Sequence, residues 1–278
     1  MRTKKCIVEN PYVGMPKRLK EIKAIAAGEA HTAALKSNGT VVVWGSNKFG
    51  QIDVPARLKG VTAIVGGQNH TVALKSDGTV VAWGNNDYGQ TTVPAGLTGV
   101  TSIAAGYNHT VALKKDGAVV AWGDNGQRQT TVPKDLKGVT SVAAGTYHTV
   151  ALKKDGAVVV WGRATCVNEL TGVVSVAAGH CYTVVLKKNG TVVTCGYVGS
   201  AVTDAPEELG SVTAVAAGRY HVVVLKKDRT VFAWGGNHHG QATIPNGLTE
   251  VIAIAVGSDH SVALKSDGTL AEWGDLPN

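Results

Sequence analysis

VTAIVGGQNHTVALKSDGTVVAWGNNDYGQTTVPAGLTG, residues 61–99, decides the fold because the chain repeats this phrase seven times. Four short runs rich in Val, Thr and Ala are separated in it by Gly, Asn and Asp, the residues that favour tight turns. The Asp-Gly between the second and third runs is a hairpin signal. Since no stretch shows helical periodicity with caps, the pattern predicts an all-β chain.

Two positions mark the repeat. The first is a residue three positions after a Gly, and it recurs every 39 residues except for one step of 34: His31, His70, His109, His148, Tyr182, His221 and His260. The second is a Trp-Gly pair that uses all six tryptophans and becomes Cys195-Gly196 in the fifth repeat. Four strands in each unit of about 40 residues, seven times over, predict a seven-bladed β-propeller of four-stranded antiparallel blades. We expect one domain over residues 1–278.

The ends of the chain suggest how the ring closes. Pro16 lies 39 residues before Pro55, so it occupies the same repeat position, while the last repeat stops soon after Trp273 without its fourth run. We therefore expect residues 9–16 to supply the outer strand of the last blade and to cover its open edge, with residues 1–22 forming the closing strand and the entry to the first blade.

The composition and charge of the chain limit the classes of partner and the compartment that we expect. The net charge of +7 equals that of the seven hairpin turns of the Lys-Ser-Asp-Gly type, which favours a solvated basic rim over an anion-binding face, although weak polyanion binding there stays open. No apolar run is long enough to cross a membrane, so no membrane partner is expected. The start shows no secretory signal, which predicts a cytoplasmic protein unless a signal was removed. The four cysteines lack paired spacing and are expected to be free thiols.

The loops that differ between repeats carry the predicted binding surface. Alternation of strand direction places the Gly-x-x-His loops and the loops after Trp-Gly at one end of the ring. Seven of the nine Phe and Tyr residues fall in these loops or at the His position, and such clustering is typical of protein-binding surfaces. Tyr182 is the exception, because it replaces a repeat His and is expected to be structural. The candidate partner-binding residues are Phe49, Tyr88, Tyr107, Tyr147, His180, Tyr197, Arg219, Tyr220 and His239.

The sequence offers no residues in a pattern typical of a catalytic site. The recurring histidines are too many to be catalytic, and each is expected to tie down a tight turn through a ring nitrogen. Neighbouring side chains on a strand point to opposite faces, so His238 and His239 make a poor metal pair. No nucleophile triad, carboxylate pair or phosphate-binding glycine loop stands out. We therefore expect no enzyme activity, no cofactor and no metal.

The consensus VAAGxxHTVALKxDGxVxAWGxNxxGQ resembles the repeat of the regulator of chromosome condensation family over nearly the whole chain. Its short units with GQTTVP are most similar to those of the propeller-type β-lactamase inhibitors of that family. The resemblance implies a monomeric propeller that binds a protein through one face, with inhibition of a β-lactamase-like enzyme as one specific form. A nucleotide-exchange or chromatin and polyanion adaptor is an alternative, although the 39-residue step leaves no room for the exchange factors' wedge segment. A sugar-binding propeller is a second alternative.

Overall fold

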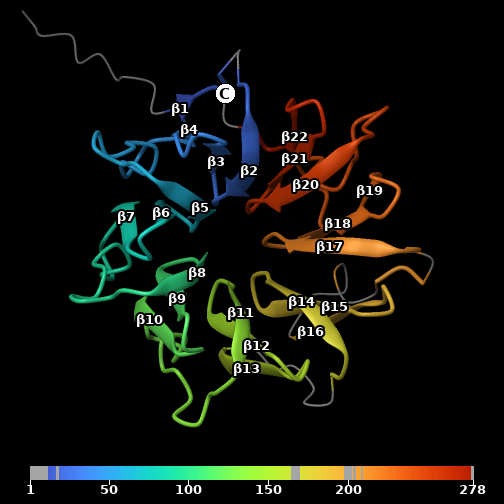
Figure 1. Ribbon diagram of the computed structural model, residues 1–278. Helices are drawn as coiled ribbons and strands as arrows, with labels where there is room; N and C mark the ends of the chain where they lie inside the picture. Colours follow the sequence, from blue (N-terminus) through green and yellow to red (C-terminus); the bar gives the residue numbers. More distant parts are fainter. Residues whose placement is uncertain are drawn as a thin grey trace, which may run out of the picture.

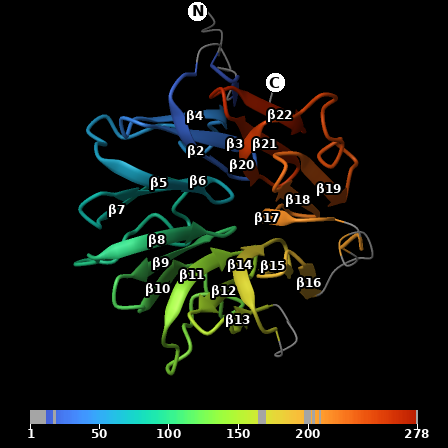
Figure 2. The same ribbon diagram turned by 45° about the vertical axis from the view of Figure 1, so that its right-hand side comes forward.

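Seven small antiparallel sheets surround a central axis in the computed structural model, which describes residues 12–16, 19–163, 170–196, 202, 205–207 and 209–276. Figures 1 and 2 show the sheets radiating from the axis as the blades of a propeller. Every regular element in this described part of the chain is a strand. The predictions of an all-β fold and of seven repeats are confirmed.

Each repeat contributes three consecutive strands, and the first of them lies nearest the axis (Figure 1). The second strand pairs antiparallel with both neighbours, as in Thr71, which lies opposite Gly66 and Trp83. The strands of the seven blades in chain order are β2 (Ile22–Ala27), β3 (His31–Lys36), β4 (Val41–Ser46); β5 (Val61–Gly66), β6 (His70–Lys75), β7 (Val80–Gly84); β8 (Val100–Ala105), β9 (His109–Lys114), β10 (Val119–Gly123); β11 (Val139–Ala144), β12 (His148–Lys153), β13 (Val158–Gly162); β14 (Val173–Ala178), β15 (Tyr182–Lys187), β16 (Val192–Gly196); β17 (Val212–Ala217), β18 (His221–Lys226), β19 (Val231–Gly235); and β20 (Val251–Val256), β21 (His260–Lys265), β22 (Leu270–Gly274).

The fourth run of each repeat, such as Gln-Thr-Thr-Val-Pro, does not form a ladder strand among the described residues. It forms turns, and its glutamine is buried between two blades. The Gln90 carbonyl accepts hydrogen bonds from the Trp122 indole at 3.0 Å and from the Thr110 hydroxyl at 2.8 Å, both in the next blade. The prediction of four-stranded blades is thus not confirmed, because this run bonds across to the next blade instead of extending its own.

The recurring tryptophan packs between neighbouring blades, as its size and apolar area lead one to expect. Trp122 is buried in a cluster with Leu74 and Val80 of the preceding blade and Ile103 of its own. The same packing recurs around the ring, so the core consists of inter-blade layers and no single central core is present among the described residues.

A buried hydrogen bond joins each blade to the next. The His70 Nε2 atom lies 3.1 Å from the hydroxyl of Thr110 in the following blade. Equivalent contacts link His31 to Thr71, His109 to Thr149, His148 to Thr183, His221 to Ser261 and His260 to Thr32. Tyr182 is buried and places its hydroxyl 3.0 Å from the Gly218 carbonyl oxygen and 2.8 Å from that of His221, so it is structural, as expected. The histidines therefore have the structural role predicted, but the ring nitrogen bonds the next blade and not its own turn.

Ring closure differs from the prediction. The short strand β1 (Tyr12–Val13) pairs antiparallel with β4 of the first blade, opposite Ser46 and Gly45, and not with β22 of the last blade. The 39-residue spacing between Pro16 and Pro55 led to the wrong partner strand. The equivalent run in the other blades does not form a ladder strand, whereas the edge of β4 is free to pair. Closure comes from contacts between the first and last blades, including Trp44 Nε1 to both Glu272 carboxylate oxygens at 3.1 Å.

Two cysteines lie in the described part of the chain. Cys181 is a buried free thiol, as expected. Cys195 is disulfide-bonded, which corrects the expectation of free thiols at that position. Among the described residues we find no helix with the length and apolarity that a membrane crossing requires.

Candidate functional site

The loop face is the end of the ring formed by the Gly-x-x-His loops and by the loops that follow the third strands. In the third blade the Gly106 amide donates a 2.9 Å hydrogen bond to the His109 carbonyl, which makes the loop tight. A Cβ on Gly106 would collide with the His109 imidazole and with the Gly145 carbonyl of the next blade. The repeat therefore requires Gly and His but leaves the two residues between them free to vary.

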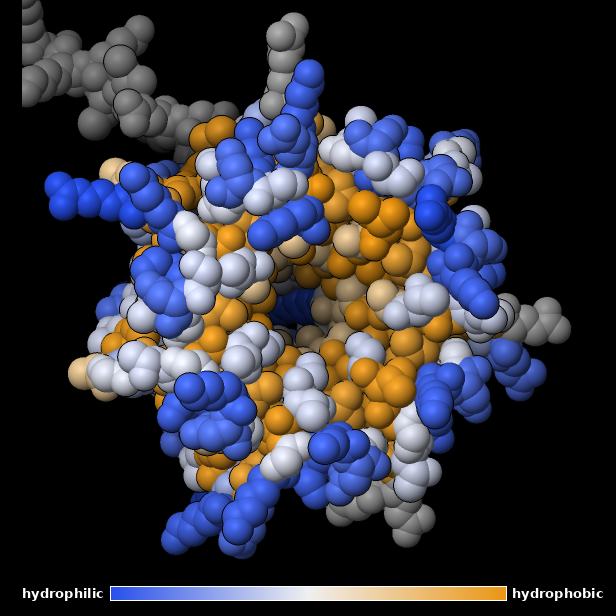
Figure 3. Space-filling model, in the orientation of Figure 1, coloured by the Kyte–Doolittle hydropathy of each residue, from blue (hydrophilic) through white to orange (hydrophobic). Residues whose placement is uncertain are grey.

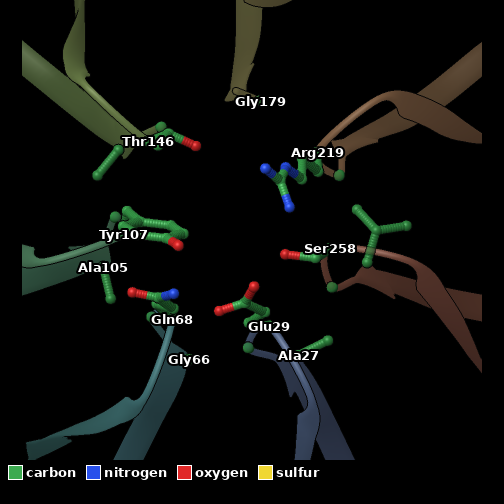
Figure 4. A pocket seen from close by; sticks show the side chains of 18 of the residues that line it. Ala27, Glu29, Gly66, Gln68, Ala105, Tyr107, Thr146, Gly179, Arg219 and Ser258 are labelled. Atoms are coloured by element: carbon green, nitrogen blue, oxygen red, sulfur yellow. The ribbon is translucent and has the colours of Figure 1, made fainter. Parts of the chain in front are cut away.

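The first free position faces the ring axis in six of the seven loops, whereas in the fifth blade this position is His180, which contacts Tyr147 and Tyr220. Figure 4 shows the six axial side chains converging on the opening at the end of the channel, which we call the axial mouth. It is a cavity of about 90 Å³ whose variable lining residues are Glu29, Gln68, Tyr107, Thr146, Arg219 and Ser258, with the repeat glycines between them. The space-filling view in Figure 3 looks at the ring from the end opposite to that seen in Figure 4, since the blades follow one another in the opposite sense. It shows the ring hollowed at its centre with hydrophobic residues around much of that opening.

Four of the predicted residues form a continuous arc of rings across four consecutive blades, here called the aromatic arc: Tyr107, Tyr147, His180 and Tyr220. Their ring centroids lie 6.3 Å apart for Tyr107 and Tyr147, 5.4 Å for Tyr147 and His180, and 5.3 Å for His180 and Tyr220. The Arg219 guanidinium lies 5.2 Å from the Tyr220 ring centroid, a cation–π contact at the end of the arc.

The remaining predicted residues lie farther out on the loop face. Phe49 and Tyr88 are 40% and 55% exposed, and His239 is also exposed. Each backbone amide donates to the side-chain oxygen of a buried glutamine two residues on, as in Tyr88 to Gln90 at 3.0 Å. The loop backbone is therefore fixed while these side chains stay free. No ring contact joins them to the aromatic arc within the described chain. Tyr197 lies outside the described residues.

Two groups at the centre of the loop face, His180 and Glu29, have pKa values shifted from their ordinary values. Partial burial lowers the pKa of His180, and the nearby Arg219 and Arg163 guanidinium groups lower it further. His180 Nδ1 lies 3.0 Å from the Thr146 hydroxyl, which holds the ring in place within the arc. Burial raises the pKa of Glu29, although the neighbouring Gln68 amide and the Arg219 charge act in the opposite direction.

Glu29, Gln68 and Ser258 were not among the candidates from the sequence. The prediction counted aromatic residues, and a single Glu or Ser in a loop carries no comparable signal. Their common position, one residue after the repeat glycine, was visible and could have placed them on the axis with Tyr107 and Arg219.

The six repeat histidines lie between the blades and not in the loops of this face. They are buried and hydrogen-bonded to the next blade. Burial lowers the pKa of His70 and His109 to about 3, so these side chains are uncharged at neutral pH. No group of three or more His, Cys, Asp and Glu residues among the described residues has the arrangement of a metal site.

Solved structures with the same fold include the ectodomains of two receptor kinases and yeast RCC1 (Prp20). The ectodomain of the Physcomitrella patens receptor kinase CR4 matches with a TM-score of 0.78 at 20% identity, covering 92% of this chain and 74% of that one. The CRINKLY WD40 ectodomain of the Arabidopsis thaliana receptor kinase ACR4 gives 0.76 at 24% identity, with 92% and 96% covered. Yeast RCC1 (Prp20), solved bound to Kap60, gives 0.69 at 20% identity, with 92% and 80% covered. At these identities the likeness shows the fold.

No curated protein sequence matches this chain significantly. The family model of the regulator of chromosome condensation (RCC1) repeat does match it, over residues 22–51, 61–90, 100–129, 139–166 and 212–241. These segments contain five of the six inter-blade histidines, His31, His70, His109, His148 and His221, and together they span more than half of the chain. The chain therefore belongs to the regulator of chromosome condensation (RCC1) repeat family.

Proposed function

We propose that the protein is a non-catalytic, monomeric propeller that binds a protein partner on its loop face, with the aromatic arc at the centre of the contact. The observation that carries this proposal is the continuous contact of four rings contributed by four different blades. A repeat scaffold does not require aromatics at these positions, since the same positions hold Ala, Asn, Asp or Ser in other blades.

The arc has the chemistry of a protein-binding surface. Tyr side chains present large apolar area with a hydroxyl at the tip, and they lose little entropy on binding because they have only two rotatable bonds. The mutual ring contacts restrain Tyr147, His180 and Tyr220 before any partner arrives, which lowers the cost of ordering them. Arg219, beside Tyr220, adds a residue type that is enriched at binding hot spots.

The fold comparison supports a protein as the partner, because the similar propeller of yeast RCC1 (Prp20) was solved bound to Kap60. Inhibition of a β-lactamase-like enzyme is the most specific form of the proposal. It rests on the resemblance of the GQTTVP units alone, and the structures reported above add no support for it. A β-lactamase inhibition assay tests this form separately.

The test is quantitative capture from a lysate of the native host with two variants compared with the wild type. Changing Tyr147, His180 and Tyr220 to Ala should leave the melting temperature nearly unchanged and should deplete the specific partner by orders of magnitude, mainly through faster dissociation. Changing the outlying Phe49 and Tyr88 to Ala is expected to cost less, because these rings lie apart from the arc. Undiminished partner capture by the arc variant would refute the proposed contact.

The opposite face provides the matched control and tests the alternative of a polyanion-binding adaptor. Charge reversal at the exposed Lys115, Lys154, Lys188 and Lys227 should leave specific partner capture intact. In four of the hairpin turns the preceding lysine lies within 3.6 Å of an aspartate carboxylate of the same turn, so part of the positive charge is already neutralised. If instead the lysine variant loses its partner at moderate salt, the adaptor alternative is favoured and the loop face is not the functional one.

A further inference from the structure

Two opposite charges face each other across the axial mouth without meeting. Glu29 comes from the first blade and Arg219 from the sixth, and Figure 4 shows both side chains directed at the opening, with Ser258 of the seventh blade between them. The two groups are close enough for each to affect the other's pKa. No ion pair joins them, although both lie in the described part of the chain, where an approach within ion-pair distance occurs at other sites such as Arg229 and Glu250.

Both charged groups are held in place. The Glu29 amide lies 3.2 Å from the Gly67 carbonyl and 3.3 Å from that of Gln68, so its backbone is tied to the second blade. The Arg219 amide likewise donates to the Ser258 carbonyl at 3.3 Å, and the guanidinium is stacked over Tyr220. The Gln68 side chain is hydrogen-bonded to the Glu29 carboxylate, so Glu29 would have to leave Gln68, or Arg219 would have to leave Tyr220, for the two charges to meet.

Both groups are partly removed from water. The Arg219 Nε atom is buried and has no hydrogen-bond partner. Burial raises the pKa of the Glu29 carboxyl group, although the Gln68 side chain supplies a hydrogen bond to it. Since a partly desolvated charge gains from an opposite charge, a ligand that presents both signs would be stabilised by the site.

We propose that the axial mouth binds a small zwitterion of the amino-acid class, with its carboxylate at Arg219 and its ammonium group at Glu29. A net-neutral dipolar ligand pairs both charges, whereas a simple anion or cation would leave one of them unpaired. The hydroxyl groups of Tyr107, Thr146 and Ser258 lie around the same opening and can complete the hydrogen bonding.

The size of the cavity favours a small ligand. Its volume is about 90 Å³. The glycines that recur between the lining residues contribute no side chain, so its dimensions are set by the six variable positions together with Val256 and the alanines at the ends of the first strands.

This site goes beyond the proposed protein-binding function and shares Tyr107 and Arg219 with it. The experiment uses ¹H–¹⁵N spectra of the full-length protein titrated with glycine, β-alanine and 4-aminobutyrate, and with acetate and methylammonium as single-charge probes at matched ionic strength. One of the zwitterions should produce saturable shifts at the amides of the axial mouth, and the single-charge probes should bind at least about tenfold more weakly.

Five variants decide the assignment. Glu29→Gln and Arg219→Gln should each weaken zwitterion binding by about tenfold or more, whereas Asp87→Asn and Arg128→Gln should not, because they remove charges from exposed loops of the same face that do not line the axial mouth. Glu29→Asp shortens the acid by one methylene and should shift the preference toward a longer zwitterion. That shift in preference cannot arise from misfolding.

The proposal fails if none of the three zwitterions saturates, if acetate or methylammonium binds as well as they do, or if the Glu29 and Arg219 variants bind as the wild type does. None of these outcomes affects the protein-binding proposal, because partner capture by the aromatic arc is measured without these probes.

Discussion

Single residues explain why the Gly-x-x-His phrase repeats. The sequence predicted that the histidines are structural, and the structure confirms this while showing a different partner. His109 bonds Thr149, which is 40 residues away, and no local pattern announces a hydrogen bond to the next repeat. The glycine is also explained only by the structure, because its Cβ would meet the imidazole ring and the next blade's backbone at once.

The glycine requirement can be tested at Gly106. An alanine there would push against the His109 ring and the Gly145 carbonyl, and a backbone atom cannot move aside cheaply. We expect Gly106→Ala to lower the free energy of unfolding by about 3 kcal/mol or more, as overpacking does in a filled core. Gly126→Ala, in an exposed loop of the same blade where a Cβ would contact only the Asp124 side chain, should change it by less than about 0.5 kcal/mol. Equal effects in urea unfolding would contradict this account.

At the scale of elements, the sequence pattern predicted the first three strands of each blade correctly, and its prediction of a fourth strand was not confirmed. Alternation and turn residues located β5, β6 and β7 correctly because those strands pair within one repeat. The run after them is equally rich in Thr and Val, but Gln90 bonds to the following blade, and composition cannot distinguish such bonds from a ladder. The same limit applies to the site, where aromatic positions were predicted but the contact of Tyr147 with His180 across the shortened repeat was not.

The junction between the first and last blades has a hydrogen bond of its own. Trp44 donates to the half-buried Glu272, whereas the Nε1 atom of the equivalent Trp83 has no partner. Trp44→Phe and Trp83→Phe remove the same volume, so their difference measures that bond. We expect Trp44→Phe to cost about 1–3 kcal/mol more in urea unfolding, the usual range for a bond to a charged group. Equal costs would show that the closure does not depend on it, and Glu272→Gln, which keeps an acceptor, should be milder than Glu272→Ala.

For the molecule as a whole, the ring closes with the same contact that joins its other blades, since His260 reaches Thr32 as His31 reaches Thr71. Six buried histidines therefore occur in one cooperative structure. Burial lowers the pKa to about 3 for His31, His70, His109 and His221, and to about 4 for His148 and His260. All six must be neutral in the folded ring.

This arrangement predicts a steep acid transition. The folded pKa values lie below the ordinary histidine pKa of about 6.5, so the unfolded chain binds more protons. The stability is therefore complete above pH 6.5 and is lost as the pH falls below it. With six groups the loss approaches about 8 kcal/mol per pH unit, enough to exceed a typical total stability within one to two units. Glu29 and Glu272 act in the opposite direction, because burial raises the pKa of both, and they reduce the slope in part.

We therefore expect cooperative unfolding between about pH 6 and pH 4, followed by circular dichroism and by the free energy of unfolding in urea at several pH values. His109→Gln keeps a hydrogen-bonding side chain without a titrating group, so it should lower the pH slope by about one proton even if it also lowers stability at pH 7. Gly126→Ala, which alters no titrating group, supplies the control and should leave the slope unchanged. A free energy of unfolding that stays constant from pH 7 to pH 5 would mean that the histidines accept protons within the folded ring, and the neutral inter-blade hydrogen bonds would then not be what holds the blades together.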